Sequence, residues 1–125
     1  FNARFGDPEC QPLMLRLRSD LVDLLDACID RRLAEVRAEW DARAAACVVL
    51  AAGGYPGKYE KGRVIHGLSQ LAEWRDGQVF HAGTLRRGDE IVTNGGRVLG
   101  VTALGESIAS AVAEAYRGVD RIHWD

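Results

Sequence analysis

The sequence has no long hydrophobic run and no block of charge of one sign. No stretch approaches the roughly 18 consecutive apolar residues that a membrane-spanning helix requires, and no signal peptide is recognisable. The 16 basic residues nearly balance the 18 acidic residues, which leaves a net charge of −2. These absences argue against nucleic acid or a membrane as the main partner of the protein.

Cysteine and histidine are also scarce. The three cysteines, Cys10, Cys28 and Cys47, are an odd number without a Cys-x-x-Cys pair, so they predict buried free thiols in a reducing compartment. The three histidines lack the spacing of metal ligands, and each is interpreted as structural. The chain has no internal repeat and begins at Phe1 without a methionine, which favours a piece of a longer polypeptide.

The most distinctive stretch is a short apolar run followed by a glycine-rich loop. Cys47–Ala51 is rich in valine and predicts a buried strand. Gly53–Gly57 contains three glycines and a proline, which predict a tight turn with at least one glycine at positive φ. The loop and the following Lys58 and Lys61 have two interpretations: backbone N–H groups placed beside an anion, or a turn with a solvated rim. The residues alone leave open whether the two lysines touch a substrate.

The first 45 residues predict a strand, two helices and a linker. Phe1–Phe5 alternates apolar and polar residues like a half-buried strand, with Asn2 and Arg4 on the same face. Asp7 is placed to cap a helical turn that begins with Pro8. The remaining predicted elements are a short helix over Gln11–Arg18, a longer helix from Ser19 or Asp20 to about Leu33, and a linker over Glu35–Arg43.

The second part of the chain predicts several short strands. They are Arg63–Gly67, Gln78–Ala82, Glu90–Thr93 and Arg97–Leu104. Asn94-Gly95-Gly96 predicts a hairpin between the last two of them. A final helix over about Ser107–Tyr116 has one apolar face and would cover an open side of the sheet. The pattern indicates an antiparallel sheet curled into a barrel or sandwich.

Four stretches of the sequence carry a resemblance to a known family. Phe1–Glu9 resembles the end of an ATP-grasp domain, whose motif is Glu-x-Asn-x-Arg, with the glutamate falling just before Phe1. Val48–Gly57, Phe80–Thr84 and Thr93–Leu99 are similar to later parts of the phosphoribosylamine–glycine ligase family, also called glycinamide ribonucleotide synthetases. Together the stretches cover essentially the whole chain in the order that the family has them.

The resemblance implies an α+β fold in two parts. Residues 1–45 would be the C-terminal end of the ATP-grasp domain, a strand plus helices. Residues 46–125 would be a truncated, barrel-like antiparallel C-terminal domain with a covering helix. The resemblance also implies a cytoplasmic enzyme in which this piece packs on the rest of the ligase and is inactive by itself.

The chemistry that the resemblance implies is ATP-dependent joining of glycine to 5-phosphoribosylamine in purine biosynthesis, by way of glycyl phosphate. ATP would be the co-substrate and Mg²⁺ or Mn²⁺ the metal, with Asn2 as one of its oxygen ligands. Arg4 would be catalytic by stabilising charge on the transferring phosphoryl group. Asp7 would orient a substrate amine or hydroxyl, although helix capping explains this aspartate equally well.

Two other interpretations stay open on the sequence. One is a non-catalytic β domain that packs on a larger body and contributes mainly an interface. The other is an ATP-grasp enzyme of the biotin-carboxylase type, which shares the Glu-x-Asn-x-Arg motif. The Gly-Asp-Pro-Glu continuation at residues 6–9 counts against this second alternative.

Overall fold

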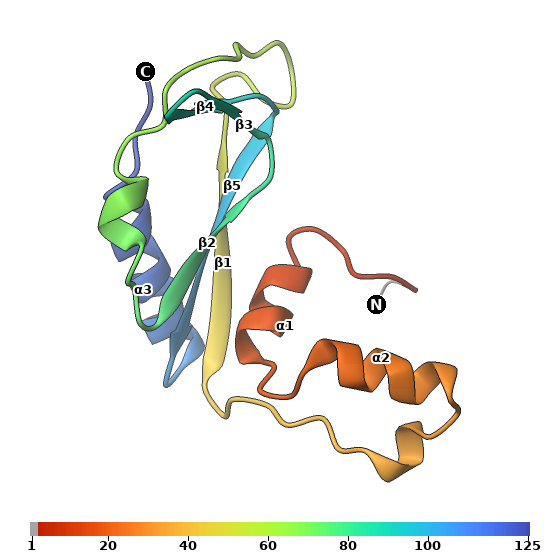
Figure 1. The fold of residues 1–125 in the computed structure, drawn as a ribbon. Helices are drawn as coiled ribbons and strands as arrows, with labels where there is room; N and C mark the ends of the chain where they lie inside the picture. Colours follow the sequence, from red (N-terminus) through yellow and green to blue (C-terminus); the bar gives the residue numbers. More distant parts are fainter. Residues whose placement is uncertain (1–2) are drawn as a thin grey trace.

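The computed structural model describes residues 3–125, which form a three-stranded antiparallel sheet, a two-stranded sheet and three α-helices (Figure 1). In chain order the elements are α1 (Cys10–Arg16), α2 (Leu21–Ile29), the 3₁₀ helix η1 (Leu33–Glu35), β1 (Ala44–Ala51), the 3₁₀ helix η2 (Leu68–Leu71), β2 (Gly77–His81), β3 (Thr84–Arg87), β4 (Glu90–Thr93), β5 (Arg97–Gly105) and α3 (Ile108–Val119). Within residues 3–125 no helix is long and apolar enough to cross a bilayer.

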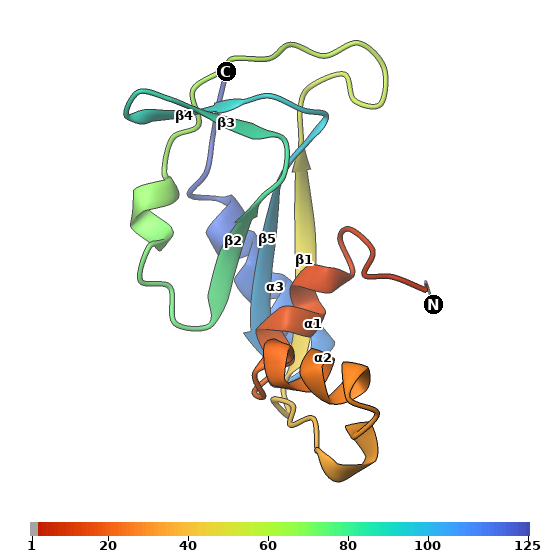
Figure 2. The same cartoon turned by 45° about the vertical axis from the view of Figure 1, so that its right-hand side comes forward.

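The main sheet has the order β1–β5–β2, so the last strand of the chain lies in its centre. Every residue from Val98 to Leu104 is buried, because both faces of β5 are covered. Figure 2 shows α1 on one face of the sheet and α3 on the other. Gly100 faces α1 and β1: a Cβ there would meet Cγ of Gln11 at an ordinary contact distance of 3.8 Å and Sγ of Cys47 at a tighter 3.2 Å.

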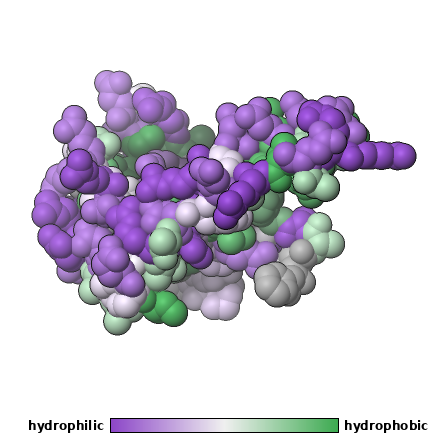
Figure 3. Space-filling view, turned by 90° about the horizontal axis from the view of Figure 1, so that it is seen from below, coloured by the Kyte–Doolittle hydropathy of each residue, from purple (hydrophilic) through white to green (hydrophobic). Residues whose placement is uncertain are grey.

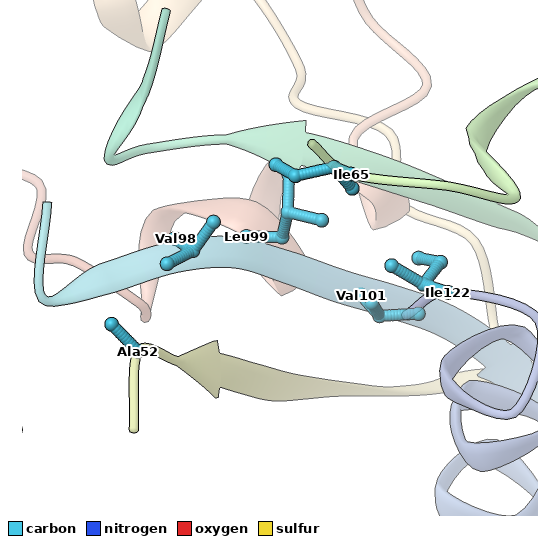
Figure 4. Close-up of a cluster of buried hydrophobic side chains, with 6 residues drawn as sticks. All are labelled: Ala52, Ile65, Val98, Leu99, Val101 and Ile122. Atoms are coloured by element: carbon cyan, nitrogen blue, oxygen red, sulfur yellow. The ribbon is translucent and has the colours of Figure 1, made fainter. Parts of the chain in front are cut away.

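The hydrophobic core lies around the start and middle of β5 (Figure 4). Its buried members come from distant parts of the chain: Ala52, Ile65, Val98, Leu99, Val101 and Ile122. Trp74 and Trp124 pack against this cluster from its margin. The core therefore joins the end of β1, the segment after the glycine-rich loop and the C-terminal residues to the central strand.

The helix α3 confirms the prediction of a final helix that covers the sheet. Ser107 caps its N-terminus: its hydroxyl oxygen accepts from the Ser110 N–H, and the Ser110 hydroxyl oxygen accepts from the Ser107 N–H at 2.9 Å. Ala111, Ala115 and Gly118 form its buried face. Residues this small bring the helix close to β5 and β1.

The helix α2 and the 3₁₀ helix η1 form an arm that extends away from the sheet, whereas α1 packs on it (Figure 1). Asp20 caps α2 as predicted, accepting from the Val22 N–H at 2.8 Å. The helix ends at Ile29, earlier than the sequence predicts, and Arg31 has a positive φ of 59°. A left-handed residue cannot continue a right-handed helix, so the chain restarts as η1.

A cluster of charged side chains joins the arm to the sheet at Asp41. The Asp41 carboxylate, only 7% exposed as a residue, accepts from the guanidinium groups of Arg18 and Arg43. Arg16 donates to the Asp41 carbonyl oxygen at 3.0 Å, and Arg43 also reaches Asp76 at 2.8 Å. The guanidinium and backbone N–H of Arg43 hold the pKa of Asp41 well below its usual range.

Two strand predictions are wrong. In Ala3–Phe5, the described part of the predicted first strand, Ala3 and Arg4 form a bend and Phe5 has no regular secondary structure. Arg63–Gly67 makes only isolated bridges, from Val64 to Val92 and from His66 to His123. Arg63–Gly67 lies against β4 and the C-terminal segment through these few contacts, without the continuous partner strand that a ladder needs.

The predicted hairpin at Asn94-Gly95-Gly96 is also wrong. β4 pairs with β3, whereas β5 pairs with β1 and β2, so the glycine segment crosses between two sheets. The hairpin lies one strand earlier, where Gly88, at a φ of 63°, and Asp89 connect β3 to β4. The fold is α+β as predicted, but residues 3–125 show open sheets and no closed barrel.

Candidate functional site

The N-terminal segment contains the predicted site residues. Arg4 is exposed, and its guanidinium donates to the Phe5 carbonyl oxygen at 3.0 Å. Asn2, predicted as a metal ligand, lies outside the described residues. Ala3 and Arg4 form a bend, so Arg4 does not lie on the regular strand that the sequence predicts.

Asp7 makes contacts that differ from the predicted helix cap. The N-cap of α1 is Glu9, and Glu9 Oε1 accepts from the Gly6 N–H at 3.0 Å. Asp7 Oδ1 instead accepts from Gln11 Nε2 at 2.7 Å, and Oδ2 lies 3.5 Å from Arg97 Nη2. The capping interpretation of Asp7 is therefore wrong, and its carboxylate is held between α1 and the start of β5.

The glycine-rich loop is closed by its own hydrogen bonds. Gly54 has a φ of 93°, which confirms the prediction of a positive-φ glycine. The Tyr55 N–H donates to the Ala52 carbonyl at 3.0 Å, and the Gly57 N–H donates to the Gly54 carbonyl at 2.8 Å. These two N–H groups are therefore used inside the turn, which favours the turn interpretation over an anion cradle.

Lys58 and Lys61 are exposed, and the structure brings neither of them to a defined site. A hollow of about 280 Å³ beside the loop is lined by other residues, including Glu60, Arg63 and Trp124. Whether the two lysines touch a substrate therefore stays open.

The structure brings Arg97 into the candidate site, which the sequence analysis missed. Arg97 Nη1 donates to the Asp7 carbonyl oxygen at 2.9 Å, across 90 positions of sequence. Its neighbour Gly96 lies beneath the Tyr55 ring, where a Cβ would overlap the ring carbons. The sequence feature that could have indicated Arg97 is Gly-Gly-Arg in the Thr93–Leu99 stretch. There the arginine directly follows two glycines, which permit close packing of the backbone.

The described residues do not build a metal site by themselves. Residues 3–125 contain no group of three or more His, Cys, Asp or Glu side chains that could hold a metal ion. The cysteines are free, as predicted, but Cys28 is exposed and the other two are only partly buried. Burial raises the pKa of the Cys47 thiol, so Cys47 is not an activated nucleophile.

These features define a class of protein, a small α+β domain whose charged N-terminal segment is fastened to the first residue of its central strand. A family model described as phosphoribosylglycinamide synthetase, C domain, matches residues 45–125. The chain therefore belongs to the phosphoribosylglycinamide synthetase family.

Relatives support the assignment over the whole chain. The phosphoribosylamine–glycine ligases of Escherichia coli O157:H7 and Vibrio cholerae are 59% and 56% identical to it over 126 and 125 residues, and both alignments cover 100% of this chain. The chain spans 29% of the length of each of these relatives. A crystal structure of phosphoribosylamine–glycine ligase from Thermotoga maritima is similar with a TM-score of 0.69 and 31% identity, over 99% of this chain and 30% of that one.

Proposed function

We propose that this stretch is the C-terminal part of an ATP-dependent ligase that joins glycine to 5-phosphoribosylamine in purine biosynthesis in the cytoplasm. The observation that carries the proposal is the 59% identity, over the whole chain, to a relative with the name phosphoribosylamine–glycine ligase. In the proposed reaction ATP phosphorylates the glycine carboxylate and leaves as ADP. The amine of phosphoribosylamine then attacks the acyl phosphate, forms the amide and releases phosphate.

The proposed division of the chain places residues 1–45 at the end of an ATP-grasp domain and residues 46–125 in the C-terminal domain. Two observations support this division. The family model begins at residue 45, at the start of β1. The arm before β1 leaves the sheet, and its helix α2 exposes Val22, Leu25 and Ile29. An apolar helix face of this kind fits packing against the rest of the ligase.

Arg4 is the proposed catalytic residue of this stretch. Its guanidinium is exposed and makes one local bond, so it is available to neutralise negative charge on a phosphoryl group or acyl phosphate. Asp7 is the proposed substrate-orienting residue. A carboxylate has about four acceptor positions, so its bonds to Gln11 and Arg97 leave capacity for a substrate amine.

The proposed metal is Mg²⁺ or Mn²⁺, which would neutralise the phosphates of ATP. We propose Asn2 as one oxygen ligand of a site completed by residues outside this stretch, because the described residues supply no ligand cluster. Hard divalent cations bind amide and carboxylate oxygens, which is the donor type that Asn2 offers.

The test of the proposed function is steady-state turnover of the full-length ligase across a magnesium series. Arg4→Ala should lower turnover about 10²–10³-fold with little rescue by metal, because it removes a charge aimed at the reacting group. Asn2→Ala should be partly rescued by higher metal concentration. Arg86→Ala, an exposed arginine of β3, is the matched control and should leave turnover unchanged.

Thermal melts of the same variants separate chemistry from folding. Arg4 is exposed, so Arg4→Ala should leave the melting temperature near that of the unchanged enzyme. Two results would show that Arg4 and Asn2 are structural: unchanged turnover in Arg4→Ala, or a collapse of the melting temperature in both Arg4→Ala and Asn2→Ala. Either result would favour the alternative of a non-catalytic packing domain.

A further inference from the structure

We propose that Arg97 is a positioning residue that holds the Arg4–Asp7 segment in place for the reaction. The inference rests on the proposed function, because it gives Arg97 a role through Arg4. Its basis is the contact between the first residue of the central strand and a segment 90 positions earlier in the chain.

The contact uses both terminal nitrogens of the Arg97 guanidinium. Nη1 donates to the Asp7 carbonyl oxygen at 2.9 Å, and Nη2 lies 3.5 Å from Asp7 Oδ2. One nitrogen therefore holds the backbone and the other faces the side chain of the same residue. Nη1 makes a hydrogen bond and Nη2 a longer ion pair, so the two contacts of one planar guanidinium constrain the direction of Asp7 as well as its distance.

The base of Arg97 is attached to a tightly packed part of the fold. The Arg97 carbonyl oxygen accepts from the Gly83 N–H at 2.8 Å, and the preceding Gly96 carbonyl accepts from the Ala52 N–H at 2.8 Å. Gly95 packs against the backbone of Gly83, where a Cβ at Gly95 would lie 2.8 Å from the Gly83 Cα. The Arg97 backbone therefore cannot shift without disturbing these three contacts, each of which involves a glycine.

The other hydrogen bonds shown for Arg4, Gly6 and Asp7 are local. Arg4 bonds the next residue, Gly6 is bonded by Glu9 and Cys10, and Asp7 is bonded by Gln11. These bonds shape the turn and join it to α1, but none of them reaches the sheet directly. The Arg97 contact supplies that connection, so its loss should let Arg4 shift relative to the core. A shift of about 1 Å at a reacting group can cost as much as 10²-fold in rate.

The test is a double-mutant cycle in the full-length ligase with Arg97→Ala and Arg4→Ala. Arg97→Ala alone should lower kcat about 10–10²-fold and change the KM for phosphoribosylamine less than about threefold. In the Arg4→Ala background the same change should lower kcat less than about threefold, because the group being positioned is already gone. Arg87→Ala, which breaks the exposed pair with Glu90 at 3.3 Å, is the matched control.

Each outcome decides the inference. Equal losses from Arg97→Ala in both backgrounds would overturn it, because Arg97 would then act independently of Arg4. A loss confined to the KM for phosphoribosylamine would also overturn it, since it would indicate direct substrate contact. If Arg4→Ala lowers kcat and Arg97→Ala does not, the positioning role of Arg97 is wrong but the proposed role of Arg4 stands. If Arg4→Ala leaves kcat unchanged, the proposed catalytic role of Arg4 is itself wrong.

A second variant covers the case in which Arg97→Ala does not fold. Arg97→Lys keeps the charge and can reach one acceptor, but it lacks the second donor of the guanidinium. A folded Arg97→Lys enzyme should show an intermediate kcat and the same dependence on Arg4. A kcat equal to that of the unchanged enzyme would overturn the inference.

Discussion

Gly54 and Gly53 are adjacent in the sequence, yet only one of them has a conformation that requires glycine. Gly54 has a φ of 93°, and a Cβ there would overlap the carbonyl oxygen of Lys58. Gly53 has no atom within 4 Å of the corresponding position. Gly54→Ala should therefore lower the free energy of unfolding by about 1–3 kcal/mol, and Gly53→Ala should change it by less than about 0.5 kcal/mol.

Urea unfolding of the full-length ligase measures this difference, with Gly53→Ala as the control. Equal effects of the two substitutions would contradict the assigned conformations. A Gly54→Ala enzyme that keeps its stability but loses activity would support the other interpretation of the loop, a cradle for an anionic ligand.

At the scale of elements, the carboxylate of Asp41 lies at the centre of the junction between the arm and the sheet. Arg43 and Arg18 lower the pKa of Asp41, so the folded state favours the ionised form. A group with a lowered pKa stabilises the folded state above its ordinary pKa of about 3.9, and the contribution is lost as the pH falls toward the folded value. Asp41→Asn should therefore lower the melting temperature at pH 7 and have a smaller effect below about pH 4.

Thermal melts of the full-length ligase between neutral and acidic pH check this dependence. Asp89→Asn, in the exposed turn between β3 and β4, is the matched control and should change the melting temperature little at pH 7. A difference between Asp41→Asn and the unchanged enzyme that is constant across the pH range would contradict the role of the ionised carboxylate.

At the scale of the whole molecule, α2 has an apolar face that residues 3–125 leave uncovered. Ile29 is 77% exposed, and Val22 and Leu25 lie on the same side of the helix. Figure 3, which views the molecule from below, shows hydrophobic patches on an otherwise largely hydrophilic surface. If this face packs on the rest of the ligase, Ile29→Lys should destabilise the full-length enzyme by about 2 kcal/mol.

The melting temperature of the full-length variant measures this effect. Asp23→Lys, at an exposed position about 100° or more around the same helix from Val22, Leu25 and Ile29, is the control and should cost less. Equal melting temperatures for Ile29→Lys and the control would show that α2 stays exposed in the ligase, which would contradict the proposed packing of the arm.

Much of the local structure could be predicted from the sequence. The strand at Glu90–Thr93 has the predicted bounds, and α3 and the cap of α2 lie where the patterns place them. β3 was missed because Thr84–Arg87 contains a single large apolar residue and no alternation. For the candidate site, the sequence predicted the segment that contains Arg4 and Asp7, but it did not predict the contact between Arg97 and Asp7.

What the sequence determined by itself was local or contiguous: the cap of α2 at Asp20, the strand at Glu90–Thr93, the positive-φ glycine and the motifs that resemble the family. The tertiary structure decided which strand pairs with which, so that Asn94-Gly95-Gly96 joins two sheets despite its turn signal. It also decided that Arg97 holds Asp7. Such contacts join residues far apart along the chain, and their geometry depends on the packing of every element between them.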